Sequence, residues 1–369
     1  MIKIISINLL VFFALVGATE FLLPLTDEAY YQFLTKFSSP VPAGGSTPLA
    51  RDDRRAELPN YRNIEWAGKH FDEYHQTSSS YRSYVGWQHD PFNSETINLV
   101  GPYNERITTH AKSSDESSPS VYFFGGSTTW GVGANDASTI PSLYSLQTGH
   151  LARNLGGLGW RPRQGINRLI DVYEAGDRPD YVIFYNGVNH IDHCRTGQTP
   201  VQHSREQQIQ ERMKGADPSY GISTIMSTHR NWANKLQRML SRQVGEKTPP
   251  YDCHTNAAKA EAVAYSLIDE WKISKALAEA HGAKFAAILQ PVAYLSKTRL
   301  DHLQLEEDLG LQYKTVYPIV QKLMADIPWA YDATSVLDAE EYFYIDFCHL
   351  SPQGNKIIAN YLAEIIGQM

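Results

Sequence analysis

The chain has 369 residues, of which 42% are hydrophobic and 20% are charged, as in globular proteins that bury a sizeable core. Its formal net charge is -7 and it has no long run of Lys and Arg, so it lacks the positive surface that nucleic acid binding requires. This length suits one large α/β domain with an additional segment.

Residues 1–25 are predominantly apolar and predict a membrane-targeting segment. Two alternatives remain open. Cleavage after Ala18 would make the segment a signal peptide, whereas continuation of the apolar run through residues 21–25 would leave it as a membrane anchor. Glu20 interrupts the longer run but would lie near the outer headgroups, and we favour the anchor. We therefore expect the rest of the chain on the extracytoplasmic face, either anchored or, after cleavage, secreted.

Residues 26–60 are interpreted as a linker, because the stretch from Ser38 to Leu58 is rich in Ser, Pro, Gly and charged residues. Residues 61–118 combine dense aromatic residues with frequent turn residues, which is typical of short strands and extended loops. We expect this second region to form an appendage packed on the main domain.

Residues 119–369 alternate short apolar runs with helical segments. Apolar runs at 121–124, 181–185 and 283–289 each end in loop residues, as buried parallel strands do. A helical pattern at 257–281 stops at Gly282. This alternation predicts an α/β fold with a doubly wound, mainly parallel sheet in a three-layer sandwich, whose site lies at the carboxyl ends of the strands. The polar stretch 190–255 is too long for an ordinary connection and is interpreted as an insertion over that site.

Two motifs carry groups suited to nucleophilic catalysis. Ser127 follows an apolar strand and two glycines, which would expose its hydroxyl at a strand end. A plain turn or a phosphate cradle would also fit, although the glycine spacing of dinucleotide-binding folds is absent. Near the C-terminus, Asp346 stands three residues before His349, and Ser351 with Pro352 then predicts a helix start. His349 could act as general base for Ser127 while Asp346 holds its tautomer.

Four blocks of the chain resemble, in order, the conserved blocks of SGNH (GDSL-like) hydrolases: residues 125–127, 154–159, 187–189 and 346–349. The resemblance implies the three-layer fold of that family, with Ser127 as nucleophile, His349 as base and Asp346 as its orienting acid. It further implies an oxyanion hole formed by the Ser127 and Gly159 backbone N–H groups and the Asn189 amide. Gly126 departs from the family pattern by replacing an Asp, and His190 replaces an Asp that commonly follows Asn189.

Cys194 and Cys253 bracket the polar insertion, whereas Cys348 adjoins His349. We expect a disulfide between the first two, although three free thiols remain an alternative. The sequence His190-Ile191-Asp192-His193-Cys194 contains several metal-ligand types, but the spacing fits no familiar zinc pattern, and we expect neither a metal nor a cofactor.

Substrate contacts are expected from His190, Trp130 and Trp160. Trp87, Trp130 and Trp160 could stack on sugar rings, with core packing as the more frequent use of Trp.

These observations predict a serine esterase that hydrolyses O-acyl groups on cell-surface or exported polysaccharide, and we expect these to be O-acetyl groups. One alternative is an O-acyltransferase that receives its acyl group from a membrane-bound partner. Another is a carbohydrate-binding assembly factor without turnover, which the complete set of catalytic residues argues against. A lipase is disfavoured because the insertion is mostly polar rather than apolar.

Overall fold

The computed structural model describes residues 53–109, 118–200 and 250–369. The chain divides into two compact units, and every described residue belongs to the unit formed by Val41–Val201 and Pro250–Met369. The other unit lies outside the described residues, as do the expected membrane segment 1–25 and most of the expected linker and insertion. Among the residues that the structure describes, no helix has the length and apolar character needed to cross a membrane.

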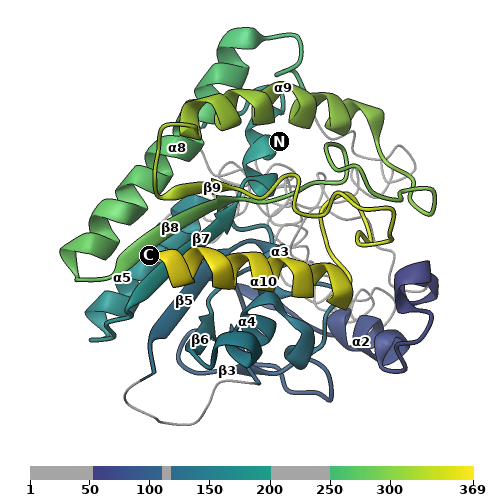
Figure 1. Ribbon diagram of the computed structural model, residues 1–369, viewed down its shortest axis with the longest axis vertical. Helices are drawn as coiled ribbons and strands as arrows, with labels where there is room; N and C mark the ends of the chain where they lie inside the picture. The colour runs from purple at the N-terminus through teal and green to yellow at the C-terminus, as the bar shows by residue number, and fades with distance from the viewer. Residues whose placement is uncertain (1–52, 110–117, 201–249) are drawn as a thin grey trace, which may run out of the picture. The chain divides into compact units, whose positions relative to one another are not determined.

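A seven-stranded sheet forms the centre of the described unit, with the strand order β3-β4-β6-β5-β7-β8-β9 (Figure 1). The strands are β3 (Leu99–Val100), β4 (Glu105–Arg106), β5 (Ser120–Gly125), β6 (Leu151–Asn154), β7 (Tyr181–Asn186), β8 (Lys284–Leu289) and β9 (Ala330–Asp332). Strands β5 to β9 are parallel to one another, whereas β4 pairs antiparallel with both β3 and β6. The chain runs from β5 to β6 on one side and then to β7 on the other, so the predicted doubly wound, mainly parallel sheet is confirmed.

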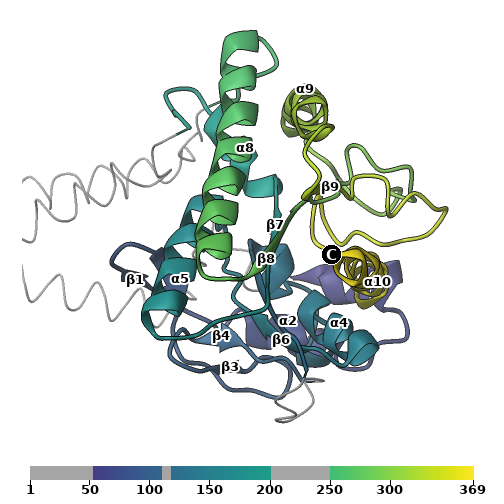
Figure 2. The same ribbon diagram turned by 60° about the vertical axis from the view of Figure 1, so that its left-hand side comes forward.

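Helices cover both faces of this sheet (Figures 1 and 2). One face carries α4 (Ile140–Thr148) and α10 (Pro352–Gln368), and the other carries α5 (Pro162–Glu174), α8 (Ala257–Ala280) and α9 (Glu307–Met324). Consecutive side chains of β5 point to opposite faces of the sheet. Phe123 packs in the core under α4 and α10, and Phe124 packs in the core under α5, α8 and α9. The apolar runs of the sequence follow from this two-sided burial.

Two helix ends lie where capping residues predict them. The Asn256 side chain accepts the Lys259 N–H at 3.1 Å and begins α8, and Gly282, at φ 84°, follows its end. The Ser351 side chain accepts the Gly354 N–H at 3.4 Å and begins α10, with Pro352 as its first residue. The second cap fixes where the chain leaves the loop that carries His349.

The region before residue 119 is only partly an appendage, which corrects the expected boundaries. It contains the 3₁₀ helices η1 (Arg54–Glu57) and η2 (Pro59–Tyr61), helix α2 (Ala67–Tyr74) and a hairpin of β1 (Ser79–Arg82) and β2 (Gly86–His89). Strands β3 and β4, however, extend the central sheet through pairing of Arg106 with Asn154. Residues 53–60, expected as linker, instead begin the packed region, because Leu58 joins an apolar cluster around Tyr61 and Phe71.

The insertion begins later than His190. Residues Val188–Cys194 form the 3₁₀ helix η4, and its Ile191 and Cys194 lie in the core under α8 and α9. The structure joins Cys194 to Cys253 in a disulfide, and Thr196 N–H donates to the Pro250 carbonyl at 2.9 Å. The two ends of the insertion therefore lie side by side at the described unit, and residues 201–249 between them lie outside the described residues.

Candidate active site

Ser127 lies at the point where the strand order reverses. Strand β5 ends at Gly125, and Ser127 is the first residue of the short helix α3 (Ser127–Trp130), with Gly126 as its N-cap. In doubly wound sheets this position, outside the carboxyl end of the strand next to the reversal, is where ligands bind. The strand-to-helix turn thus presents the Ser127 hydroxyl at the expected site edge.

Ser127, His349 and Asp346 form a continuous hydrogen-bonded chain. His349 Nε2 lies 2.7 Å from Ser127 Oγ, and His349 Nδ1 lies 2.6 Å from Asp346 Oδ2. With the Nδ1 proton held by the carboxylate, Nε2 is left to accept the proton of the Ser127 hydroxyl. The side chains of His349 and Asp346 are 16% and 32% exposed, so a substrate can approach the triad.

The Asp346 carboxylate is held by the loop that carries it. Its Oδ1 accepts the backbone N–H groups of Cys348 at 2.9 Å and His349 at 2.8 Å. Burial alone would raise the pKa of Asp346, but the charge of His349, its side-chain hydrogen bond and the two backbone donors lower it well below its usual value. Asp346 therefore stays ionised and can fix the imidazole tautomer across the neutral pH range.

The predicted oxyanion donors lie beside the nucleophile. The Asn189 side-chain nitrogen donates to the Trp160 carbonyl at 2.9 Å, and a β-carbon placed on Gly126 would lie 2.4 Å from it. One of its two protons is thus engaged and the second is available. Gly159 lies in the loop after β6 at φ 68°, a β-carbon there would meet open space, and its N–H has no backbone partner among the described residues. Both groups can therefore donate to a bound oxygen.

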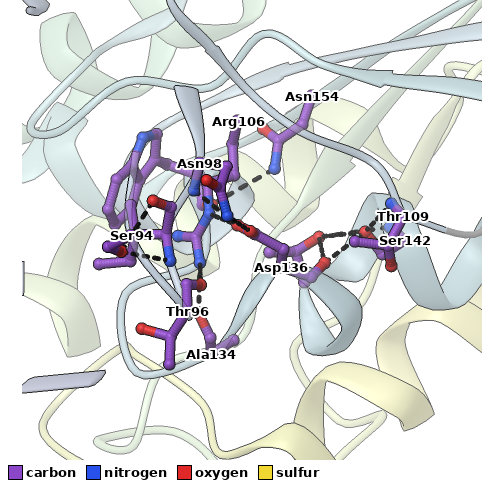
Figure 3. A network of polar contacts seen from close by, with 12 residues as sticks. Ser94, Thr96, Asn98, Arg106, Thr109, Ala134, Asp136, Ser142 and Asn154 are labelled. Atoms are coloured by element: carbon purple, nitrogen blue, oxygen red, sulfur yellow. Dashed lines mark hydrogen bonds and ion pairs between the residues drawn. The ribbon is translucent and has the colours of Figure 1, made fainter. Parts of the chain in front are cut away.

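A buried polar network fixes the segment that follows Ser127 (Figure 3). The Arg106 guanidinium pairs with Asp136 at 2.5 Å and donates to the Ala134 carbonyl at 2.7 Å. Asn98 also donates to Asp136, at 2.7 Å, and Asn154 donates to the Thr129 carbonyl at 2.8 Å. Because a buried charge is tolerated only when it is paired, this network ties β4 and β6 firmly to residues 127–136.

The N-terminal region supports the loop of Asp346, which sequence patterns did not indicate. Asn60 donates to the carbonyls of Tyr342 at 3.0 Å and Tyr344 at 2.9 Å. Arg55 forms a bidentate pair with Asp53 at 2.9 and 2.6 Å. Burial would lower the pKa of Arg55, but the carboxylates of Asp53 and Asp346 raise it, so a permanent positive charge lies on the Asp346 side of the site.

The expected substrate contacts of Trp130, Trp160 and His190 are wrong, because all three side chains are buried. Trp130 is fully enclosed, with its ring stacked on His89 at 4.7 Å. Trp160 is 4% exposed and donates its Nε1 proton to the Trp87 carbonyl at 2.6 Å. These rings pack in the interior and offer no free face to a sugar.

His190 is 1% exposed and contacts the Ser266 hydroxyl at 2.7 Å. Burial and the charge of Arg161 lower its pKa to about 3, so it is a neutral interior group. The replacement of an Asp by His190 therefore acts inside the protein and does not provide a charged group for substrate orientation.

Asp346, Cys348 and His349 place three ligand types within 4.8 Å of one another. The Cys348 thiol is 3% exposed, and burial raises its pKa well above the usual value, which disfavours the thiolate that metals bind. His349 Nδ1 is already hydrogen-bonded to Asp346, so the grouping is accounted for by the triad loop itself.

No family model and no curated protein matches the sequence. Solved structures do match. A member of the lipolytic protein G-D-S-L family from Veillonella parvula is 11% identical, with 68% of this chain and 100% of that chain covered and a TM-score of 0.40. A carbohydrate acetylesterase family member from Sinorhizobium meliloti is 15% identical, with 67% and 97% covered and a TM-score of 0.34.

An acetyl xylan esterase from Butyrivibrio proteoclasticus is 11% identical, with 69% of this chain and 64% of that chain covered and a TM-score of 0.36. The three solved structures thus resemble this chain at identities of 11% to 15% and TM-scores of 0.34 to 0.40.

Proposed function

We propose that the chain is a serine esterase that hydrolyses O-acyl esters through an acyl-enzyme on Ser127. The observation that carries this proposal is the unbroken chain of hydrogen bonds from Asp346 through His349 to Ser127, at 2.6 and 2.7 Å, at the carboxyl end of β5. A hydroxyl needs such a base to become a nucleophile at neutral pH. Because Asp346, His349 and Ser127 are all in hydrogen-bonding position, a catalytically silent binding protein is the weaker alternative.

In the first half-reaction, Ser127 Oγ attacks the acyl carbonyl carbon while its proton passes to His349 Nε2. The carbonyl oxygen becomes an oxyanion, which the Ser127 and Gly159 N–H groups and the Asn189 amide are proposed to stabilise. The carbon–oxygen bond to the alcohol then breaks, and His349 returns the proton to the leaving oxygen. In the second half-reaction, water attacks the acyl-enzyme by the same route and releases the carboxylic acid.

The proposed substrate is an O-acetylated polysaccharide outside the cytoplasmic membrane. Two features support this location: the apolar residues 1–25, and the Cys194–Cys253 disulfide, since such bonds persist mainly in oxidising compartments. The same site could pass its acyl group to an alcohol instead of water. A transferase outside the membrane would need a membrane-bound partner to supply that group, so the esterase is the simpler function.

The assignment is tested with a fluorophosphonate probe and short-chain nitrophenyl esters on the chain from residue 26 onward. We expect Ser127→Ala to abolish covalent labelling and ester hydrolysis, and His349→Ala to lower both nearly as far. Ser145, which is buried on α4, provides a matched Ser→Ala control away from the triad. Labelling of Ser127→Ala at the wild-type rate would exclude Ser127 as the nucleophile.

Hydrolysis and transfer are separated by the fate of the acetyl group. The wild-type chain is given nitrophenyl acetate with an excess of oligosaccharide, and free acetate and acetylated sugar are measured together. We expect mostly free acetate. A predominance of acetylated sugar would replace the esterase by the acyltransferase and keep Ser127, His349 and Asp346 in the same roles.

A further inference from the structure

The β1–β2 hairpin exposes two tyrosine side chains to solvent. Tyr84 at its tip is 87% exposed, and Tyr81 on β1 is 48% exposed. Tyr81 and Trp87 lie opposite each other in the hairpin register, with ring centroids 6.0 Å apart and planes at 78°. Val85, the only aliphatic residue between Ser79 and His89, is 3% exposed.

The backbone of Tyr84 is strained for an aromatic residue. Its φ of 66° lies in the left-handed region, where Gly or Asn would be accommodated more easily. The Asn167 side chain on α5 donates to the Tyr84 carbonyl and so holds this turn in place. An exposed aromatic ring on a strained, anchored turn adds little to stability, which points to a use outside the fold.

Two hydrogen bonds connect this hairpin to the candidate active site. Trp160 Nε1 donates to the Trp87 carbonyl at 2.6 Å, and the Trp160 carbonyl accepts the Asn189 amide at 2.9 Å. The loop that contains Gly159 therefore has the hairpin on one side and the nucleophile turn on the other. The hairpin is therefore hydrogen-bonded to the residue that follows Gly159.

We propose that Tyr81 and Tyr84, with Trp87 packed edge-on against Tyr81, form a binding surface for the sugar rings of a polysaccharide, which extends the candidate active site along the β1–β2 hairpin. This inference rests on the proposed function for its link to catalysis. Aromatic faces stack on the C–H faces of sugars, and the exposed Arg82 and Ser83 beside the rings can hydrogen-bond to hydroxyls. A lipid surface fits poorly, because the hairpin exposes no aliphatic side chain and carries a single basic residue, Arg82.

The test uses Ser127→Ala, so that binding is measured without turnover. Its migration is followed by native electrophoresis in gels that contain single polysaccharides from a panel of neutral and acidic polymers. We expect at least one polymer to retard the protein, and Tyr81→Ala with Tyr84→Ala in the same background to weaken that binding roughly tenfold or more. Tyr265→Ala is the matched control, because Tyr265 is a 52% exposed tyrosine on α8.

Retardation by none of the polymers, or equal retardation of the hairpin variant and the parent, would overturn the sugar surface. Hairpin-dependent binding to phosphatidylcholine vesicles, with no polymer retarded, would replace it by a lipid surface. Thermal unfolding of each variant checks that the fold is intact. The proposed esterase function is tested separately by wild-type hydrolysis of nitrophenyl acetate, so either proposal can fail while the other stands.

Discussion

The Asn189 side-chain nitrogen occupies space that a β-carbon at position 126 would need. An ideal β-carbon on Gly126 would lie 2.4 Å from Asn189 Nδ2 and 3.2 Å from the Trp160 carbonyl oxygen. SGNH-like sequences have an Asp at the position of Gly126, so this chain differs from them beside the nucleophile. Gly126 thus permits the close approach of the Asn189 amide to the Ser127 turn.

Gly126→Ala should therefore impair catalysis more than stability. The nearest obstructing atom is the end of a short side chain, so Asn189 would move and the backbone would not. Loss of a correctly placed oxyanion donor should lower kcat by on the order of 10²-fold. The measurements are kcat with nitrophenyl acetate and the free energy of unfolding in urea. Gly68→Ala on α2 is the control, because nothing lies within 4 Å of the added carbon. An unchanged kcat in Gly126→Ala would contradict a catalytic role for the Asn189 position.

Asp346→Asn should leave the fold intact and lower turnover by about 10²- to 10⁴-fold. The amide would offer His349 Nδ1 the wrong hydrogen-bonding partner and would no longer stabilise the imidazolium. Because the pKa of Asp346 is held well below its usual value, the wild type should retain an ionised Asp346 throughout the neutral range. The check is kcat against pH, with exposed Asp326→Asn as the control. Equal profiles for wild type and Asp346→Asn would reduce the triad to a Ser–His dyad.

The strands that the sequence predicts are those buried on both faces. Runs at 121–124, 181–185 and 283–289 lie within one residue of β5, β7 and β8 because continuous apolar residues are diagnostic there. The apolar pattern does not indicate strand β6, because this strand contains the charged Arg153. In the structure, Arg153 is paired with Glu105 at 2.7 Å and Asp177 at 2.5 Å. Strands β3 and β4 have two residues each and depend on tertiary pairing, which no local pattern reveals.

Motif spacing identifies groups that can react, but not which side chains are exposed. Ser127 and His349 are 222 positions apart, and the fold brings them into hydrogen-bonding contact as the motifs predicted. Trp130, only three residues after Ser127, is nevertheless buried beneath the Arg106 guanidinium, 4.6 Å from its ring. The Arg55–Asp53 pair beside Asp346 has no sequence signature, because its position depends on how the N-terminal region packs against the triad loop.

Removing the Cys194–Cys253 bridge should destabilise the unit that contains it. The two residues are 59 positions apart, and on the chain-entropy model closure of such a loop contributes about 4 kcal/mol. The double variant Cys194→Ser with Cys253→Ser should show this loss in urea unfolding, with Cys348→Ser as the control. Intact-mass analysis without reductant should find one alkylatable thiol in the wild type after unfolding. Three such thiols in protein made in an oxidising compartment would refute the bridge.

Glu270 on α8 should make the folded chain less stable as the pH rises from acidic to neutral. Burial raises its pKa to about 7, against the opposing charges of Arg161 and Arg163. Its Oε2 lies 3.9 Å from His190 Nδ1, and neither atom has a hydrogen-bond partner within the described residues. A raised carboxyl pKa means that the folded chain keeps a proton that the unfolded chain releases above about pH 4.5. Protonated Glu270 therefore contributes its full stabilisation below about pH 4.5. This contribution is lost as the pH rises through 7.

Glu270→Gln isolates this effect, because the amide cannot ionise and has nearly the same shape. The free energy of unfolding of the wild type, relative to Glu270→Gln, should fall by up to about 3 kcal/mol between pH 4.5 and 7.5. Urea unfolding at each pH provides the measurement. Glu261→Gln is the control, since Glu261 is an exposed glutamate on the same helix. Parallel stability curves for wild type and Glu270→Gln would show that Glu270 ionises as readily in the folded chain as in the unfolded one. In that case, the interior around His190 would have to supply water or a charge to the carboxylate.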